Sequence, residues 1–162
     1  MGHSERRNFY NETQELVTAK VKEAEACGLG IVYCCGETEA QRLEELQEQV
    51  VFEQLVALQE ARVTDWDRVV IVYEPLWAMG TGTIASADQT QEACEMIRGW
   101  VKQNIGQKES EQVRVVFGGN VTEGNGDLIK LPDVDGFLVG STSTKPIFRT
   151  IFDIVNGYVQ GN

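Results

Sequence analysis

The sequence has a single histidine, His3, and four cysteines, Cys27, Cys34, Cys35 and Cys94, none of which forms a CxxC pair. Too few soft ligands remain for a zinc cluster, so we expect no metal site of that kind. Cys34 and Cys35 are neighbours on an expected strand, and their side chains should therefore point to opposite faces. We expect all four cysteines to be reduced thiols.

Basic residues are also scarce, with 14 Lys and Arg against 25 Asp and Glu and a net charge of −11. Such a chain repels a phosphodiester backbone, and its basic residues are scattered, so we expect no nucleic-acid partner. No apolar run approaches the roughly 20 residues that cross a bilayer, and the start MGHSERRNFY lacks the apolar segment of a signal peptide. The sequence therefore predicts a cytoplasmic protein without a membrane partner.

Short apolar runs of about strand length recur along the chain, and they lie at residues 29–34, 69–73, 113–117 and 136–140. Most of them are nearly continuous in apolar residues, which is typical of parallel strands covered on both faces. Segments between them place apolar residues at three- and four-residue spacing, which predicts helices over 12–27, 39–61 and 87–105. This alternation predicts the α/β class, with one domain over residues 1–162.

The helix expected over 39–61 has a mixed character. Roughly one side of it carries Leu43, Leu46, Val50, Gln54 and Ala57. Its glutamates lie largely on the other sides, and we interpret them as a solvated face.

Small or polar residues follow each expected strand, as CGE at 35–37, EP at 74–75, GGN at 118–120 and GST at 140–142. The carboxyl ends of parallel strands meet at one edge of a sheet, and α/β proteins build their sites there. We therefore expect Glu74, Gly80, Asn120 and Gly140 to open onto one face.

The stretch YEPLWAMGTG, residues 73–82, has the composition of a lid over a carboxylate. Glu74 leaves a buried strand directly before a proline, which favours an extended conformation for Glu74. An apolar tip follows, closed by Gly80 and Gly82, and its closure would exclude water and raise the basicity of Glu74. On these residues alone, an ordinary loop with buried apolar side chains is the simpler interpretation.

The same stretch closely resembles the lid motif of the triosephosphate isomerases. FGGNV, DGFLVGS and GHSERR resemble other signatures of that family in the same order, and the resemblance covers essentially the whole chain. It implies a TIM-barrel fold and the interconversion of dihydroxyacetone phosphate and D-glyceraldehyde 3-phosphate in glycolysis and gluconeogenesis. It also implies a triose phosphate substrate, no cofactor, no metal and, in the family, a homodimer.

The resemblance assigns roles to individual residues. Glu74 is implied to be the general base, and His3 the neutral electrophile that polarises the substrate carbonyl. The lid is implied to comprise Pro75, Leu76, Trp77, Ala78, Met79, Gly80, Thr81 and Gly82. Substrate phosphate is implied to bind at backbone N–H groups of Gly80, Asn120, Gly140 and Ser141.

Two of these positions depart from the family pattern. The family usually has serine at the position of Asn120 and a second glycine at the position of Ser141. Both residues keep a backbone N–H, but Asn120 loses a hydroxyl and Ser141 adds a Cβ that restricts the backbone. We expect an effect on phosphate affinity more than on the reaction.

A (β/α)8 barrel needs about 250 residues and eight strands. The sequence predicts four strands plus a stub before His3, which matches roughly the last four βα units. On this reading the first three units and most of the fourth strand are absent, together with the family's active-site lysine and asparagine, its dimer loop and the support for His3. One hypothesis is an isomerase that is inactive alone and associates with an N-terminal half or a full-length subunit. The other is a non-catalytic truncated paralogue that acts as an interaction partner.

Overall fold

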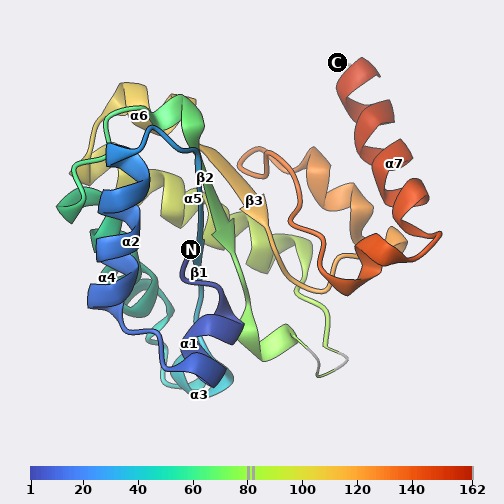
Figure 1. The fold of residues 1–162 in the computed structure, drawn as a ribbon. Helices are drawn as coiled ribbons and strands as arrows, with labels where there is room; N and C mark the ends of the chain where they lie inside the picture. The colour runs from blue at the N-terminus through green and yellow to red at the C-terminus, as the bar shows by residue number, and fades with distance from the viewer. Residues whose placement is uncertain (80, 82, 162) are drawn as a thin grey trace.

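The central sheet of this computed structural model, which describes residues 1–79, 81 and 83–161, is parallel throughout. Its strand order is β1 (Ile31–Cys35), β2 (Val69–Tyr73) and β3 (Arg114–Phe117). Ile31 pairs with Val69, and Val70 pairs with Arg114. Helices flank the strands in Figure 1, which confirms the α/β class.

The fourth expected strand, 136–140, is reduced to a single parallel bridge between Phe117 and Phe137. Phe117 N donates to Gly136 O at 3.0 Å, and Leu138 N donates to Phe117 O at 2.9 Å. The chain then turns at Gly140 (φ −81°, ψ −125°) into the short helix η4 (Ser141–Thr144), so the ladder cannot continue. The prediction of a full strand is therefore wrong, although the segment runs in the expected direction.

The outer edge of β1 is paired by the first residue of the chain. Cys34 N donates to Met1 O at 2.8 Å, and the Met1 amino group donates to Val32 O. Gly2 then turns the chain at φ +69°, and the position favours glycine because a Cβ there would lie 2.9 Å from Cys34 O. His3 follows at once, so it is held at the edge of the sheet, and the expectation that it lacks support is wrong.

The expected helices 12–27 and 87–105 appear as α2 (Gln14–Ala26) and α5 (Ala87–Asn104). Thr13 caps α2 and Ser86 caps α5, each accepting a hydrogen bond from a backbone N–H of the first turn. The helix expected over 39–61 is instead two helices, α3 (Glu39–Leu43) and α4 (Gln47–Glu60). The break contains Glu45 at φ +60°, a left-handed conformation that no helix interior accommodates.

The remaining elements were not predicted from the sequence. They are α1 (Ser4–Tyr10), η1 (Trp66–Arg68), η2 (Leu76–Ala78), α6 (Gln107–Gln112), η3 (Glu123–Lys130) and α7 (Phe148–Gly161). Among the described residues, no helix is both long enough and apolar enough to span a bilayer.

The two faces of the sheet are covered to different extents. Cys35, Ile71 and Val115 belong to the main core under the helices, whereas Cys34, Val72 and Val116 form a small cluster on the other face. Adjacent Cys34 and Cys35 therefore point to opposite faces, as expected. On the small-cluster face Val32 is 45% exposed, so this side of the sheet is only partly covered.

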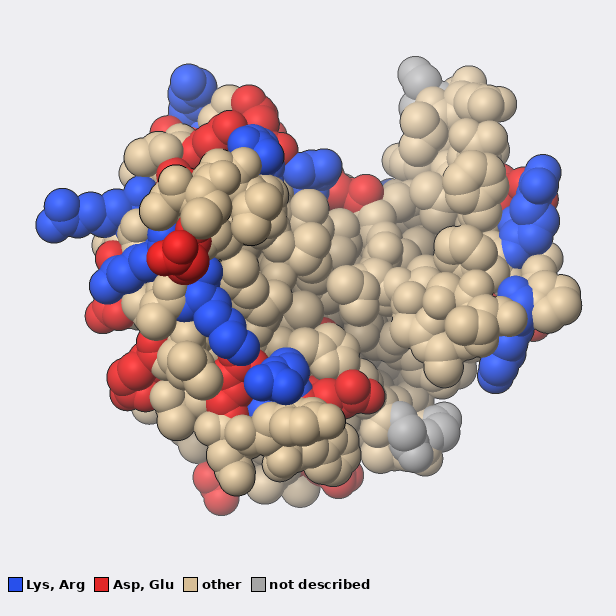
Figure 2. All heavy atoms as spheres, in the orientation of Figure 1, with Lys and Arg blue, Asp and Glu red and all other residues tan. Residues whose placement is uncertain are grey.

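The C-terminal helix α7 lies to one side of the sheet and packs against η3 (Figure 1). Ile151 of α7 is buried, but Phe152 and Val159 are 54% and 65% exposed. In Figure 2 most of the charged side chains lie over the half with α1, α2 and α4, others lie at the outer edge on the side of α7, and the indented surface between is largely uncharged.

Candidate active site

Glu74 directly follows β2 and is almost completely buried, with 1% of its surface exposed. Its backbone N–H donates to Cys35 O at 2.8 Å, which continues the pairing of β1 and β2 beyond the last ladder residues. Gly36 packs so closely that a Cβ there would lie 1.9 Å from Glu74 O. The backbone of two strand ends therefore fixes the position of the carboxylate.

The two oxygens of the Glu74 carboxylate have different environments. Oε2 accepts a hydrogen bond from Ser4 N at 3.0 Å. Oε1 lies 3.0 Å from His3 Nε2, but the two groups are not aligned for a hydrogen bond, and Oε1 has no such partner among the described residues. Burial raises the pKa of the Glu74 carboxyl above its usual value, although the Ser4 N–H and His3 act in the opposite direction. A buried carboxylate with a raised pKa and one free oxygen can act as a general base.

His3 is the N-cap residue of α1, and its side-chain Nδ1 accepts a hydrogen bond from Glu5 N at 3.3 Å. Because Nδ1 is the acceptor, the proton of a neutral imidazole must lie on Nε2. That is the nitrogen that faces Glu74. The sharp turn after Met1 therefore sets the place of His3, and the Glu5 N–H sets its tautomer.

A pocket of about 260 Å³ lies beside this pair. Its lining contains His3 together with Met79 beyond β2, Asn120 beyond β3, and Gly140 and Ser141 beyond the bridged segment. Glu74 itself lines a second, neighbouring pocket of about 140 Å³. Of the expected site residues that the structure describes, His3, Asn120, Gly140 and Ser141 thus line one pocket, and Glu74 lines the pocket beside it.

The glycines near this pocket are required by packing. A Cβ at Gly118 would lie 2.4 Å from Val72, and one at Gly119 would lie 2.3 Å from the Phe117 ring. Asn120 follows them and is exposed, and its carbonyl accepts a hydrogen bond from the Asn125 side chain at 2.9 Å. The two glycines and this hydrogen bond therefore fix the turn that carries Asn120.

The first half of the expected lid is buried and anchored. Leu76 N donates to Glu37 O at 3.1 Å, and the indole N–H of Trp77 donates to Glu37 Oε1 at 2.8 Å. Trp77 and Ala78 are only 9% and 1% exposed, so they do not form the apolar tip that the sequence suggested. Thr81 is exposed and its hydroxyl donates to Trp77 O at 3.0 Å, whereas Gly80 and Gly82 lie outside the described residues.

A sequence model described as triosephosphate isomerase matches residues 1–156 of the chain. The chain belongs to the triosephosphate isomerase family. The match covers all of the residues that form the two pockets and the described part of the lid.

Glu37, the last residue of the triplet CGE at the end of β1, was not among the site residues predicted from the sequence. Glu37 is fully buried and accepts hydrogen bonds from Tyr73 Oη at 3.0 Å, Trp77 Nε1 at 2.8 Å and Arg42 at 2.9 Å. The Arg42 guanidinium also lies over the Trp77 ring, 4.5 Å from its centre. Glu37 thus ties the start of the lid to the end of β1, and a charged residue just after a buried strand was the available signal.

Proposed function

We propose that this chain carries out the proton transfer of a triosephosphate isomerase, interconverting dihydroxyacetone phosphate and D-glyceraldehyde 3-phosphate. The observation that carries the proposal is the buried Glu74 carboxylate, 3.0 Å from His3 Nε2 at the edge of a pocket. Glu74 removes a proton from one substrate carbon and returns it to the neighbouring carbon. His3 Nε2–H polarises the carbonyl and moves protons between the two oxygens, a division of roles already established for triosephosphate isomerase itself.

The substrate phosphate is proposed to bind at the strand ends opposite His3. Gly140 and Ser141 lead into η4, and Asn120 ends the turn after β3, so each can offer a backbone N–H without a cationic side chain. Gly80, outside the described residues, is proposed to add a further N–H from the lid. An acidic chain can bind an anion in this way because the partial charges belong to the backbone.

Full activity is proposed to require further strands from another chain, either an N-terminal half or a full-length subunit. This is supported by the sheet face where Val32 is 45% exposed, since a barrel would cover that face. The same face favours a second candidate function, in which the chain is a non-catalytic interaction partner of a full-length subunit.

A coupled isomerase assay tests these proposals on the purified chain, alone and mixed with a separately expressed N-terminal half from a family relative. We expect negligible turnover by the chain alone and measurable turnover by the mixture. Glu74→Asp is the control, because shortening the base by one methylene misplaces it. Turnover that survives Glu74→Asp would contradict the role of Glu74, and no turnover in any mixture would favour the non-catalytic function.

A further inference from the structure

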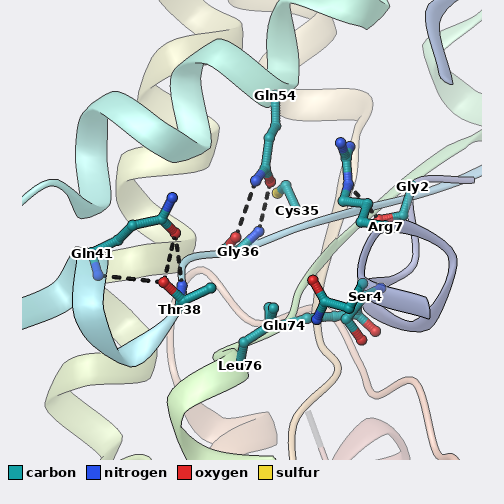
Figure 3. A pocket seen from close by; sticks show the side chains of 11 residues that line it. Gly2, Ser4, Arg7, Cys35, Gly36, Thr38, Gln41, Gln54, Glu74 and Leu76 are labelled. Atoms are coloured by element: carbon teal, nitrogen blue, oxygen red, sulfur yellow. Dashed lines mark hydrogen bonds between the residues drawn. The ribbon is translucent and has the colours of Figure 1, made fainter. Parts of the chain in front are cut away.

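The second pocket, behind Glu74, is bordered by a glutamine of α4 whose side chain reaches the end of β1 (Figure 3). Gln54 Oε1 accepts a hydrogen bond from Gly36 N at 2.8 Å, and Gln54 Nε2 donates to Gly36 O at 3.1 Å. The side-chain amide therefore satisfies both backbone groups of one buried residue. The hydrogen bonds of the Gly36 backbone are therefore satisfied by this one side chain.

The residues on either side of Gly36 bond in the other direction. Cys35 O accepts from Glu74 N at 2.8 Å, and Glu37 O accepts from Leu76 N at 3.1 Å. Alternate residues of a parallel strand bond to opposite neighbours, so Gln54 occupies the place of a neighbouring strand. Gly36 also presses on the Glu74 carbonyl without room for a Cβ. Gly36 is thus held between the Gln54 amide and the Glu74 backbone, so a displacement of Gly36 toward β2 must displace the backbone of Glu74.

The same turn of α4 also reaches the histidine. Gln54 O accepts hydrogen bonds from Tyr33 Oη and, at 2.7 Å, from Gln14 Nε2. Gln14 Oε1 in turn accepts from the Arg7 guanidinium at 2.9 Å, and Arg7 Nε donates to Gly2 O at 2.8 Å. Gly2 directly precedes His3. One residue is thus connected to the backbone beside both members of the His3–Glu74 pair.

We propose that Gln54 is a positioning residue, whose side-chain amide holds the end of β1 so that Glu74 keeps its distance from His3. This rests on the proposed function only in calling the pair catalytic. A merely structural Gln54 would help to attach α4 to the sheet, and its loss would lower stability without moving Glu74 in the folded protein. The two roles differ in what they do to the carboxylate.

The test replaces Gln54 with Met, which keeps the length of the side chain and removes both hydrogen bonds. Gln41→Met is the matched control, since Gln41 lines the same pocket but its side chain bonds to Thr38 and not to Gly36 (Figure 3). In the folded proteins we expect Gln54→Met alone to shift the NMR signals of the Glu74 carboxyl and the Ser4 amide. We also expect the Gly36 amide to exchange with solvent about fivefold faster or more.

These readouts need no turnover, so they decide the positioning role even if the isomerase proposal fails. Unchanged Glu74 and Ser4 signals in folded Gln54→Met would overturn it, as would equal shifts in Gln41→Met. In any assembly that shows isomerase turnover, Gln54→Met should lower kcat about tenfold or more with little change in KM, because misplacing a base impairs the chemical step. Gln54→Glu, which retains an acceptor for Gly36 N–H, should give a smaller displacement of the Ser4 signal.

Discussion

Trp77 donates its indole N–H to Glu37, 2.8 Å away, and this bond joins the start of the lid to the end of a neighbouring strand. Glu37 has no exposed surface, and Arg42, its ionic partner, is 25% exposed. The Glu37 carboxylate is therefore shielded from water, whereas the Arg42 side chain remains partly exposed to it.

We expect Glu37→Gln to destabilise the fold by about 1–3 kcal/mol, because Arg42 then loses its anionic partner while remaining partly buried. Denaturant unfolding measures the change. The control is Glu39→Gln, the same substitution at an exposed position of α3, which should change stability by less than about 0.5 kcal/mol. Equal effects of the two substitutions would show that the buried carboxylate is not an anchor.

The second prediction concerns the pH dependence of stability. Burial raises the pKa of Glu74 in the folded protein, so the folded state binds a proton more readily than the unfolded state. Wild-type stability relative to Glu74→Gln should therefore increase as the pH falls from about 7 toward 4.5, the ordinary pKa of the group. Unfolding of both proteins across this range gives the difference, and a decrease toward low pH would contradict the raised pKa.

A third prediction compares two glycines. Gly36→Ala should destabilise the protein by about 3 kcal/mol or more, because its Cβ would lie 1.9 Å from a backbone oxygen. Gly99→Ala, on α5 with nothing within 4 Å of the new Cβ, should stabilise it by about 0.5–1 kcal/mol. Thermal unfolding measures both, and a tolerated Gly36→Ala would show that β1 and β2 are not in close contact at Glu74.

The fourth prediction concerns Arg98, which joins α5 to the loop before the bridged segment. It contacts Asp133 at 2.8 Å and Asp135 at 2.7 Å, and it is 21% exposed. Arg98→Lys cannot keep this forked arrangement and should cost about 1–3 kcal/mol. Arg149→Lys is the control, because the Arg149 and Asp153 side chains are 79% and 55% exposed and such a pair contributes little. Similar losses for the two variants in denaturant unfolding would contradict this difference.

The sequence predicted the elements whose signal is local. Continuous apolar runs located β1, β2 and β3 to within one or two residues, and helical spacing located α2 and α5. The prediction failed where the backbone conformation of a single residue decides where a helix ends. Glu45 is left-handed without being glycine, so the break between α3 and α4 had no marker, and Leu43, expected among the residues on one side of a helix, is 79% exposed.

The candidate site was predictable only in part for a related reason. The strand-end rule brought Asn120 and Gly140 to one pocket, because parallel segments end at the same edge, and Glu74 lines the neighbouring pocket. Gly80, the fourth residue of that prediction, lies outside the described residues. The contacts of Glu37 with Trp77 and of Gln54 with Gly36 join residues 40 and 18 positions apart, and no local pattern encodes them. Trp77 looked like part of an exposed tip because its partner could not be known.

The close contact between Gly36 and Glu74 also limits how this site can be redesigned. A Cβ at Gly36 or Gly118 would collide with the chain, whereas one at Gly140 would meet nothing within 4 Å, and Asn120 and Ser141 are already exposed. Variant libraries that aim at a different substrate should therefore randomise 120, 140 and 141 and leave 36 and 118 fixed. The Glu74 carboxylate would then stay in place while the opposite wall of the pocket changes.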